Sequence, residues 1–218
     1  MYIKTVRIFF HKTDRTIYTS HLDLMRAMSR ALSRSGLPIW YTQGFHPHIY
    51  LTFALPLALG VTGLYESMDI RLNEDIPNEE ILRSLNMALP EGLRAVSVGE
   101  PVMEPKAIMW ADYRIFLRCE VLEGRQALEA FSALAEVPTQ KRSKKGIKTV
   151  DIKPMFEILS INDEQNGLMV TLRCRAGVEV NLNPTLVLEA LSEATGFRAH
   201  HTQIARFAVW DETLQAFL

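Results

Sequence analysis

The sequence lacks the short motifs that identify the common nucleotide-binding, metal-binding and hydrolytic enzymes. It contains no P-loop, no G-x-G-x-x-G, no C-x-x-C, no H-E-x-x-H and no G-x-S-x-G. Its longest apolar run, residues 50–61, includes a threonine and a proline and falls short of the roughly 20 residues that cross a bilayer. The first ten residues do not form the uninterrupted apolar stretch of a signal peptide. We therefore expect no interaction with a membrane.

Cysteine is scarce, with Cys119 and Cys174 as the two thiols among 218 residues, each beside an arginine in a predicted strand. Two thiols are too few for an iron–sulfur cluster held by three or four thiolates. This excludes radical chemistry that relies on such a cluster in this chain alone, and we expect no cofactor. Free thiols are typical of a reducing compartment, which predicts a cytoplasmic protein.

The net charge is only −1, but charge is unevenly distributed along the chain. Residues 1–64 carry seven Lys or Arg against two Asp, whereas residues 65–100 carry three Arg against eight acidic residues. A second basic cluster, at 141–148, consists of Lys141, Arg142, Lys144, Lys145 and Lys148. The overall balance argues against a general nucleic-acid binder, while the local excess allows one defined contact with an anion.

Hydrophobic periodicity and turn residues predict the same order of elements in both halves of the chain. In the first half, strands are expected at 3–10, 38–41, 64–72 and 94–98, and helices at 22–35 and 78–88. In the second half, strands are expected at 113–121, 137–141, 149–152, 156–162, 167–174 and 200–209, and helices at 125–134 and 184–195. We predict an α+β protein of two tandem ferredoxin-like (RRM-like) βαββαβ halves packed together, residues 1–100 and 107–218, joined at 99–106.

The helix at 22–35 has clear ends, because the Ser20 hydroxyl can accept the backbone N–H of Asp23 and Gly36 permits a left-handed stop. Leu22, Met25, Ser29 and Leu32 fall on one side of this helix, so most of that side is apolar. A separate stripe consists of Arg26, Arg30 and Arg34. A bound polyanion would relieve the repulsion between these like charges, and a solvated face neutralised by acids from 65–100 explains the stripe as well.

The loop after this helix, Gln43-Gly44-Phe45-His46-Pro47-His48, places two imidazoles on a stiffened turn. His46 and His48 can act as general acid and base, as metal ligands, or as surfaces that bind nucleobases. A metal site needs a third ligand, for which His21 with Asp23 behind it is the candidate. Because His-x-His is a weak zinc signal, we expect no metal site. Surface histidines on a structural loop explain the motif equally well.

Aromatic residues accompany these imidazoles. Tyr41, Phe45 and Tyr50 can each stack on an unpaired base, a contact of roughly 1–3 kcal/mol. For Phe45 and Tyr50, which lie beside an apolar run, packing against the sheet is the favoured interpretation. The basic cluster at 141–148 has no aromatic residue and is typical of a basic hairpin that touches phosphate without reading sequence, or of a solvated loop.

Residues 20–63 resemble the radical-SAM-linked domain family, a group of unknown function. The resemblance rests on SHLDLMR at 20–26, GLP at 36–38, QGFHPH at 43–48 and ALPLALGV at 54–61, with weaker agreement over most of the remaining chain. Ile49 departs from the family, which usually has proline there. Members of this family are fused to a radical SAM protein or encoded next to one, often near ribonuclease G and ribosomal-protein genes. The resemblance therefore implies RNA or ribosome modification, with this domain as an accessory unit.

We carry three hypotheses from the sequence. The first is a non-catalytic RNA-recognition protein that works with a radical SAM enzyme on a separate chain. The second is a metal-independent ribonuclease or RNA-modifying enzyme that uses His21, His46 or His48. The third is a module that docks on the radical SAM partner. The expected RNA or substrate contacts are Ser20, His21, Asp23, Arg26, Arg30, Arg34, Tyr41, Gln43, Phe45, His46, His48, Lys141, Arg142, Lys144, Lys145 and Lys148.

Overall fold

The computed structural model describes residues 2–143 and 146–218, and it describes side chains for these residues except those of 141–143 and 146–148. The chain divides into two units, Met1–Ile108 with Gln215–Leu218, and Met109–Leu214. The expected division at 99–106 lies a few residues before this boundary. The last four residues belong with the first unit, which the sequence did not indicate.

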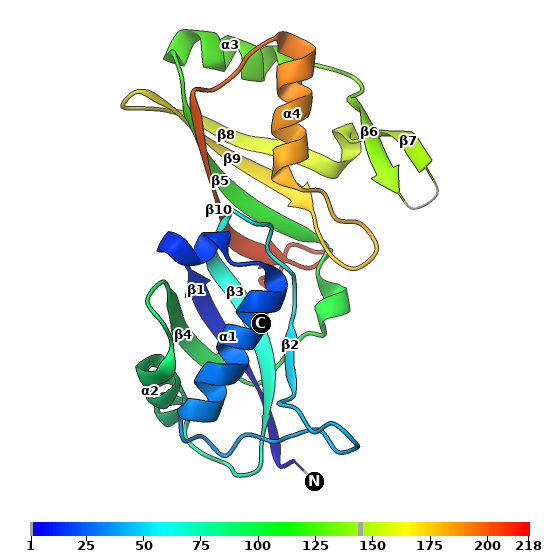
Figure 1. Ribbon diagram of the computed structural model, residues 1–218. Helices are drawn as coiled ribbons and strands as arrows, with labels where there is room; N and C mark the ends of the chain where they lie inside the picture. Colours follow the sequence, from blue (N-terminus) through cyan, green and yellow to red (C-terminus); the bar gives the residue numbers. More distant parts are fainter. Residues whose placement is uncertain (1, 144–145) are drawn as a thin grey trace. The chain divides into compact units, whose positions relative to one another are not determined.

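The first unit is an antiparallel sheet with two helices (Figure 1). In chain order it consists of β1 (Lys4–Lys12), α1 (His21–Arg34), β2 (Leu51–Phe53), β3 (Thr62–Leu72), α2 (Asn78–Ala88) and β4 (Leu93–Gly99), with short 3-10 turns at Asp14–Tyr18 and Pro105–Ala107. Within the unit the strands pair in the order β4-β1-β3-β2. Leaving out the 3-10 turns, the elements of this unit follow one another along the chain as β-α-β-β-α-β.

Both helices of the first unit share one core on one face of the sheet. Successive side chains of a strand point to opposite faces, and alternate residues of β1 and β3 enter this core. The buried set from the strands is Val6, Ile8, Phe10, Met68, Ile70 and Leu72, and α1 contributes Leu24, Met28, Ala31 and Leu32. Of the mostly apolar side that the sequence marks on α1, only Leu32 is among the buried residues of this core. The buried stripe starts at Leu24, and Leu22 is 55% exposed.

The opposite face of this sheet carries a buried ion pair. Arg7 donates from Nε to Asp69 Oδ1 at 2.7 Å and from Nη2 to Asp69 Oδ2 at 2.8 Å. Its Nη1 donates to the backbone oxygens of Met103 and Leu218, each at 2.8 Å. The guanidinium also lies 4.3 Å from the ring centroid of Phe217, which is buried. Arg7 thus fastens the last residues of the chain to the first unit.

The second unit has the same strand order with one added hairpin. It consists of β5 (Trp110–Arg118), α3 (Val121–Ser132), β6 (Pro138–Ser143), β7 (Gly146–Asp151), β8 (Phe156–Glu164), β9 (Gly167–Arg175), α4 (Pro184–Thr195) and β10 (His201–Trp210), with a 3-10 turn at Lys153–Met155. Its sheet runs β10-β5-β9-β8, and β6 and β7 form a separate hairpin. The α+β class is confirmed. That the halves are tandem ferredoxin-like duplicates stays a prediction.

Individual elements agree with the sequence to different degrees. The limits predicted for α2 and α4 are those observed, and Gly36 has the left-handed φ expected after α1. The strand expected at 38–41 is wrong, because this stretch makes only isolated bridges, Ile39 to Leu72 and Tyr41 to Ile49. The short strand that pairs with β3 on the side opposite β1 is β2. It lies within the apolar run at 50–61, for which the sequence indicated only that it is too short to cross a bilayer.

Cys119 and Cys174 are both free and buried, and burial raises the pKa of each thiol. Both cysteines are therefore unreactive thiols of the core. Among residues 2–143 and 146–218, each helix is too short or too polar to span a lipid bilayer.

We predict that Asp69→Ala lowers the free energy of unfolding by about 3 kcal/mol, because it leaves the Arg7 guanidinium buried without its carboxylate. Urea denaturation followed by circular dichroism measures the change. The control is Asp75→Ala, which removes an exposed carboxylate 2.8 Å from Lys4 Nζ and should cost less than about 1 kcal/mol. Equal losses in the two variants would contradict the importance given to the buried pair.

Candidate functional site

The first turn of α1 is built as the sequence predicted. The backbone N–H of Asp23 donates to the Ser20 hydroxyl at 3.2 Å, and that hydroxyl donates to Asp23 Oδ2 at 2.7 Å. The hydrogen bond from Ser20, and then that from Arg26, lower the pKa of the Asp23 carboxyl. Ser20 and Asp23 are therefore occupied in starting the helix. Their roles at a binding site remain predictions.

A groove of about 620 Å³ runs between α1 and residues 48–52. One wall consists of Leu22, Met25, Arg26, Ser29, Arg30 and Ser33 from α1. The other wall is the chain that leads into β2, from His48 to Thr52. The helix and the end of the histidine loop thus face each other across the groove. Leu22, Met25 and Ser29, from the mostly apolar side that the sequence marks on this helix, are wall residues.

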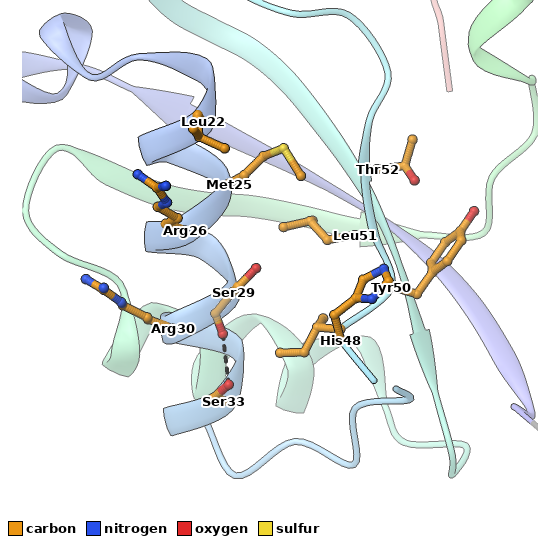
Figure 2. A pocket seen from close by; sticks show the side chains of 11 residues that line it. Leu22, Met25, Arg26, Ser29, Arg30, Ser33, His48, Tyr50, Leu51 and Thr52 are labelled. Carbon is orange, nitrogen blue, oxygen red and sulfur yellow. Dashed lines mark hydrogen bonds between the residues drawn. The ribbon is translucent and has the colours of Figure 1, made fainter. Parts of the chain in front are cut away.

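The interior of the groove is apolar, and its charges lie outside. In Figure 2, Met25 and Leu51 point toward one another across the gap, with Ser29 beside them. The side chains of Arg26 and Arg30 extend from the side of α1 that faces away from this gap, and Tyr50 and Thr52 point away from the helix. The groove is therefore an apolar trough with cations on its outer rim, rather than a positively charged pocket.

The three arginines of the stripe have different surroundings. Arg26 Nη1 lies 3.2 Å from Asp23 Oδ1 in an exposed pair. Arg34 donates to the backbone oxygen of Ala88, the last residue of α2, at 2.9 Å. Arg30 has no side-chain hydrogen bond or ion pair within the part of the chain that the structure describes. Neutralisation by acids from 65–100, one of the two interpretations of the stripe, is therefore not seen for these three side chains.

His48 is held at the mouth of the groove by Thr42. The His48 backbone N–H donates to Thr42 Oγ1 at 3.1 Å, and the Thr42 N–H donates to the His48 oxygen at 2.8 Å. The His48 Nδ1 lies 3.0 Å from Thr42 Oγ1 and 3.0 Å from the His46 backbone oxygen. Sequence reasoning missed Thr42. Its position, six residues before His48 across a Gly- and Pro-containing turn, was the available signal.

The other predicted loop residues do not line the groove. Tyr41, Gln43, Phe45 and His46 are exposed, and Phe45 is fully so. Packing of Phe45 against the sheet was thus wrong, because the Thr42–His48 hydrogen bonds close the loop below it and leave its ring at the tip. Gly44 has a positive φ of +137°, which glycine permits at this turn.

The imidazoles do not gather into one site. The His21 ring packs edge-on against Phe53, with ring centroids 5.4 Å apart, and does not line the groove. Within residues 2–143 and 146–218, no three His, Cys, Asp or Glu side chains are grouped so that they could hold a metal ion. The groove wall itself includes one imidazole, that of His48.

The predicted basic cluster belongs to the second unit. Lys141, Arg142 and Lys148 are in the β6–β7 hairpin, with Lys141 opposite Lys148 in the register. Lys144 and Lys145 lie outside the described residues. The expected basic hairpin is present in its backbone, and its contact with phosphate stays a prediction.

Comparison with known proteins yields one family. The model of the family described as uncharacterized protein conserved in bacteria (DUF2344) matches residues 5–184. No curated protein matches the chain. A crystal structure of an unknown protein from Galdieria sulphuraria is 14% identical, with a TM-score of 0.27 over 93% of this chain and 96% of that chain. The family description does not mention radical SAM enzymes, so that association remains a prediction.

We predict that Thr42→Val loosens the mouth of the groove. Losing a hydrogen bond worth about 1 kcal/mol should speed hydrogen exchange of the His48 amide about fivefold. Exchange measured by NMR gives the rate. Thr52→Val is the control, because Thr52 also lines the groove but makes no side-chain hydrogen bond with a described residue. An unchanged rate at His48 would show that Thr42 does not hold it.

Proposed function

The chain belongs to the DUF2344 family, and we propose that it recognises RNA at the α1–β2 groove as an accessory protein of a radical SAM enzyme. In this proposal the groove receives an unpaired base, and the arginines on its outer rim bind the adjoining phosphates. The protein acts in the cytoplasm, and the chemistry on the RNA is performed by the partner.

The observation that carries this proposal is the separation of apolar and charged groups at the groove. A nucleotide has an apolar, stackable base and a charged phosphate, and single-stranded nucleic acids bind where both find a partner. Met25 and Leu51 offer the apolar surface, and Arg26 and Arg30 offer cations on the outer rim. A small anion would bind the rim without using the trough.

The electrostatics of α1 favour a polyanionic ligand. Arg26, Arg30 and Arg34 follow one another at intervals of four residues, so their charges repel along the helix. Arg30 has no anionic partner among the described residues. The exposed Arg26–Asp23 pair contributes little stability, so a phosphate can replace Asp23 as the partner of Arg26. Two guanidiniums are thereby available to neighbouring phosphates.

The enzyme hypothesis has less support. Acid–base cleavage of RNA by imidazoles needs two groups that reach one phosphate. His48 lines the groove, whereas His21 packs on Phe53 and His46 is at the exposed loop. His48 therefore fits better as a hydrogen-bonding group beside a bound base than as half of a catalytic pair.

Partnership with a radical SAM enzyme rests on the sequence resemblance at residues 20–63. The same residues form the groove wall and the histidine loop, which links the resemblance to the proposed site. A docking module without RNA would use the same surface. Dependence of the complex on RNA separates these two possibilities.

We predict that Arg26→Ala/Arg30→Ala weakens binding of total cell RNA about tenfold. Two lost phosphate contacts should also reduce the slope of log affinity against log salt by about 1.4. Electrophoretic mobility shifts at two salt concentrations measure both effects. The control is Arg83→Ala, an exposed arginine on α2 that does not line the groove. Equal RNA affinity of the double variant and the wild type would contradict the proposal.

We further predict that affinity purification of the tagged chain from its native cells captures a radical SAM protein, identified by mass spectrometry. Ribonuclease treatment should release it if RNA links the two. Capture that survives ribonuclease but is lost on replacing Phe45 and His46 by alanine would favour the docking module. Absence of any radical SAM protein in the captured fraction would remove this part of the proposal.

A further inference from the structure

A cluster of three aromatic rings surrounds one guanidinium in the first unit, close to the groove. The Cζ atom of Arg71 lies 3.9 Å from the ring centroid of Tyr50, 4.1 Å from that of Tyr2 and 5.3 Å from that of Trp40. The Trp40 ring meets those of Tyr2 and Tyr50 edge-on, at 5.6 and 6.3 Å. We call these four residues the Arg71 cluster.

The Arg71 cluster lies on the face of the sheet opposite α1 and α2. Arg71 stands in β3 between Ile70 and Leu72, which both enter the core beneath the helices, so its side chain leaves on the other face. Tyr50 likewise alternates with Ile49 and Leu51, which pack toward the helices. The short strand β2 therefore has the groove on one side and the Arg71 cluster on the other.

Arg71 lacks the partners that an arginine in this setting normally has. No carboxylate of a described residue lies within ion-pair distance of its guanidinium, and its buried Nε has no hydrogen-bond partner among those residues. Arg7, on the same sheet, has a bidentate carboxylate and two backbone oxygens. The rings hold Arg71 in place through cation–π contacts, which leave its N–H donors unused.

The two Nη groups of this guanidinium, which unlike the Nε are not buried, can donate to the oxygens of a phosphate. The surrounding rings offer stacking surface to a base, and Tyr2 is 36% exposed. If the cluster served only to fasten residues 40–50 to β3, contacts between the rings would stabilise that packing. An arginine without an anionic partner would not be needed for it. A phosphate with an adjoining unpaired base satisfies both the guanidinium and the rings.

We propose that the Arg71 cluster is a second nucleotide subsite and that the ligand is single-stranded RNA crossing the edge of the sheet at β2. One base enters the α1–β2 groove, and a neighbouring nucleotide places its phosphate on Arg71 and its base on Tyr2 or Tyr50. A duplex cannot bind this way, because its bases are paired and stacked on each other. This inference rests on the proposed function and narrows its substrate to unpaired RNA.

The test compares a fluorescein-labelled oligoribonucleotide with the same strand annealed to its complement, by fluorescence anisotropy with the full chain. We expect the single strand to bind at least about tenfold more tightly than the duplex. Arg71→Gln and Tyr50→Leu should each weaken single-strand binding about tenfold, and the control Arg83→Gln should not. The single strand should also quench tryptophan fluorescence in the wild type but not in Trp40→Phe.

The outcomes separate the two proposals. Equal binding of the single strand and the duplex would overturn the second subsite and leave RNA recognition at the groove. Full affinity in Arg71→Gln together with weak binding by Arg26→Ala/Arg30→Ala would have the same consequence. Failure of the wild type to bind either RNA overturns both. Circular dichroism checks the fold of each variant. If Arg71→Gln does not fold, Arg71→Lys replaces it, because lysine keeps the charge and loses the planar fork. Weaker single-strand binding by Arg71→Lys and quenching of Trp40 in the wild type would then support the second subsite, and the absence of both would overturn it.

Discussion

The alternation of side chains along β2 and β3 is the constraint on which the candidate site depends. Ile49, Leu51 and Phe53 pack toward the helices, and β2 is paired with β3 so that Leu51 stands opposite Ile70. Because these apolar side chains pack toward the core, Tyr50 and Thr52 between them must face the other side of the sheet. Residues 48–52, which lead into β2 and include its first two residues, thereby form one wall of the groove and also hold the ring of Tyr50 against Arg71.

The two faces of this edge present complementary chemistry. On the helix side, an apolar trough has its cations on the outer rim, at Arg26 and Arg30. On the other side, a cation without an anionic partner among the described residues is surrounded by aromatic rings. Each arrangement suits a ligand that combines an apolar ring with a negative charge. The buried pair of Arg7 and Asp69 stands on the same sheet and shows how an arginine with a structural role is satisfied here.

Much of the local structure was predictable, whereas the composition of the site was only partly so. Ser20 and Gly36 act on neighbouring backbone groups, so the ends of α1 could be predicted from the residues themselves. The inward side of α1 could not, because two stripes of apolar residues, one from Leu22 and Met25 and one from Leu24 and Met28, compete for burial. The position of the sheet selects between them. Phe45 shows the same limit, since a hydrophobic side chain is buried only if its backbone can bring it to the core.

What the sequence by itself determined is the α+β class, the ends of α1, α2 and α4 to within a residue, and the turn at Gly44. These depend on residues close together in the chain. The tertiary structure alone decided that Met25 faces Leu51, that His21 and His46 do not join His48 at the groove, and that Tyr2, Trp40, Tyr50 and Arg71 meet. These contacts depend on which faces are buried against each other, and burial is a property of the packed chain as a whole.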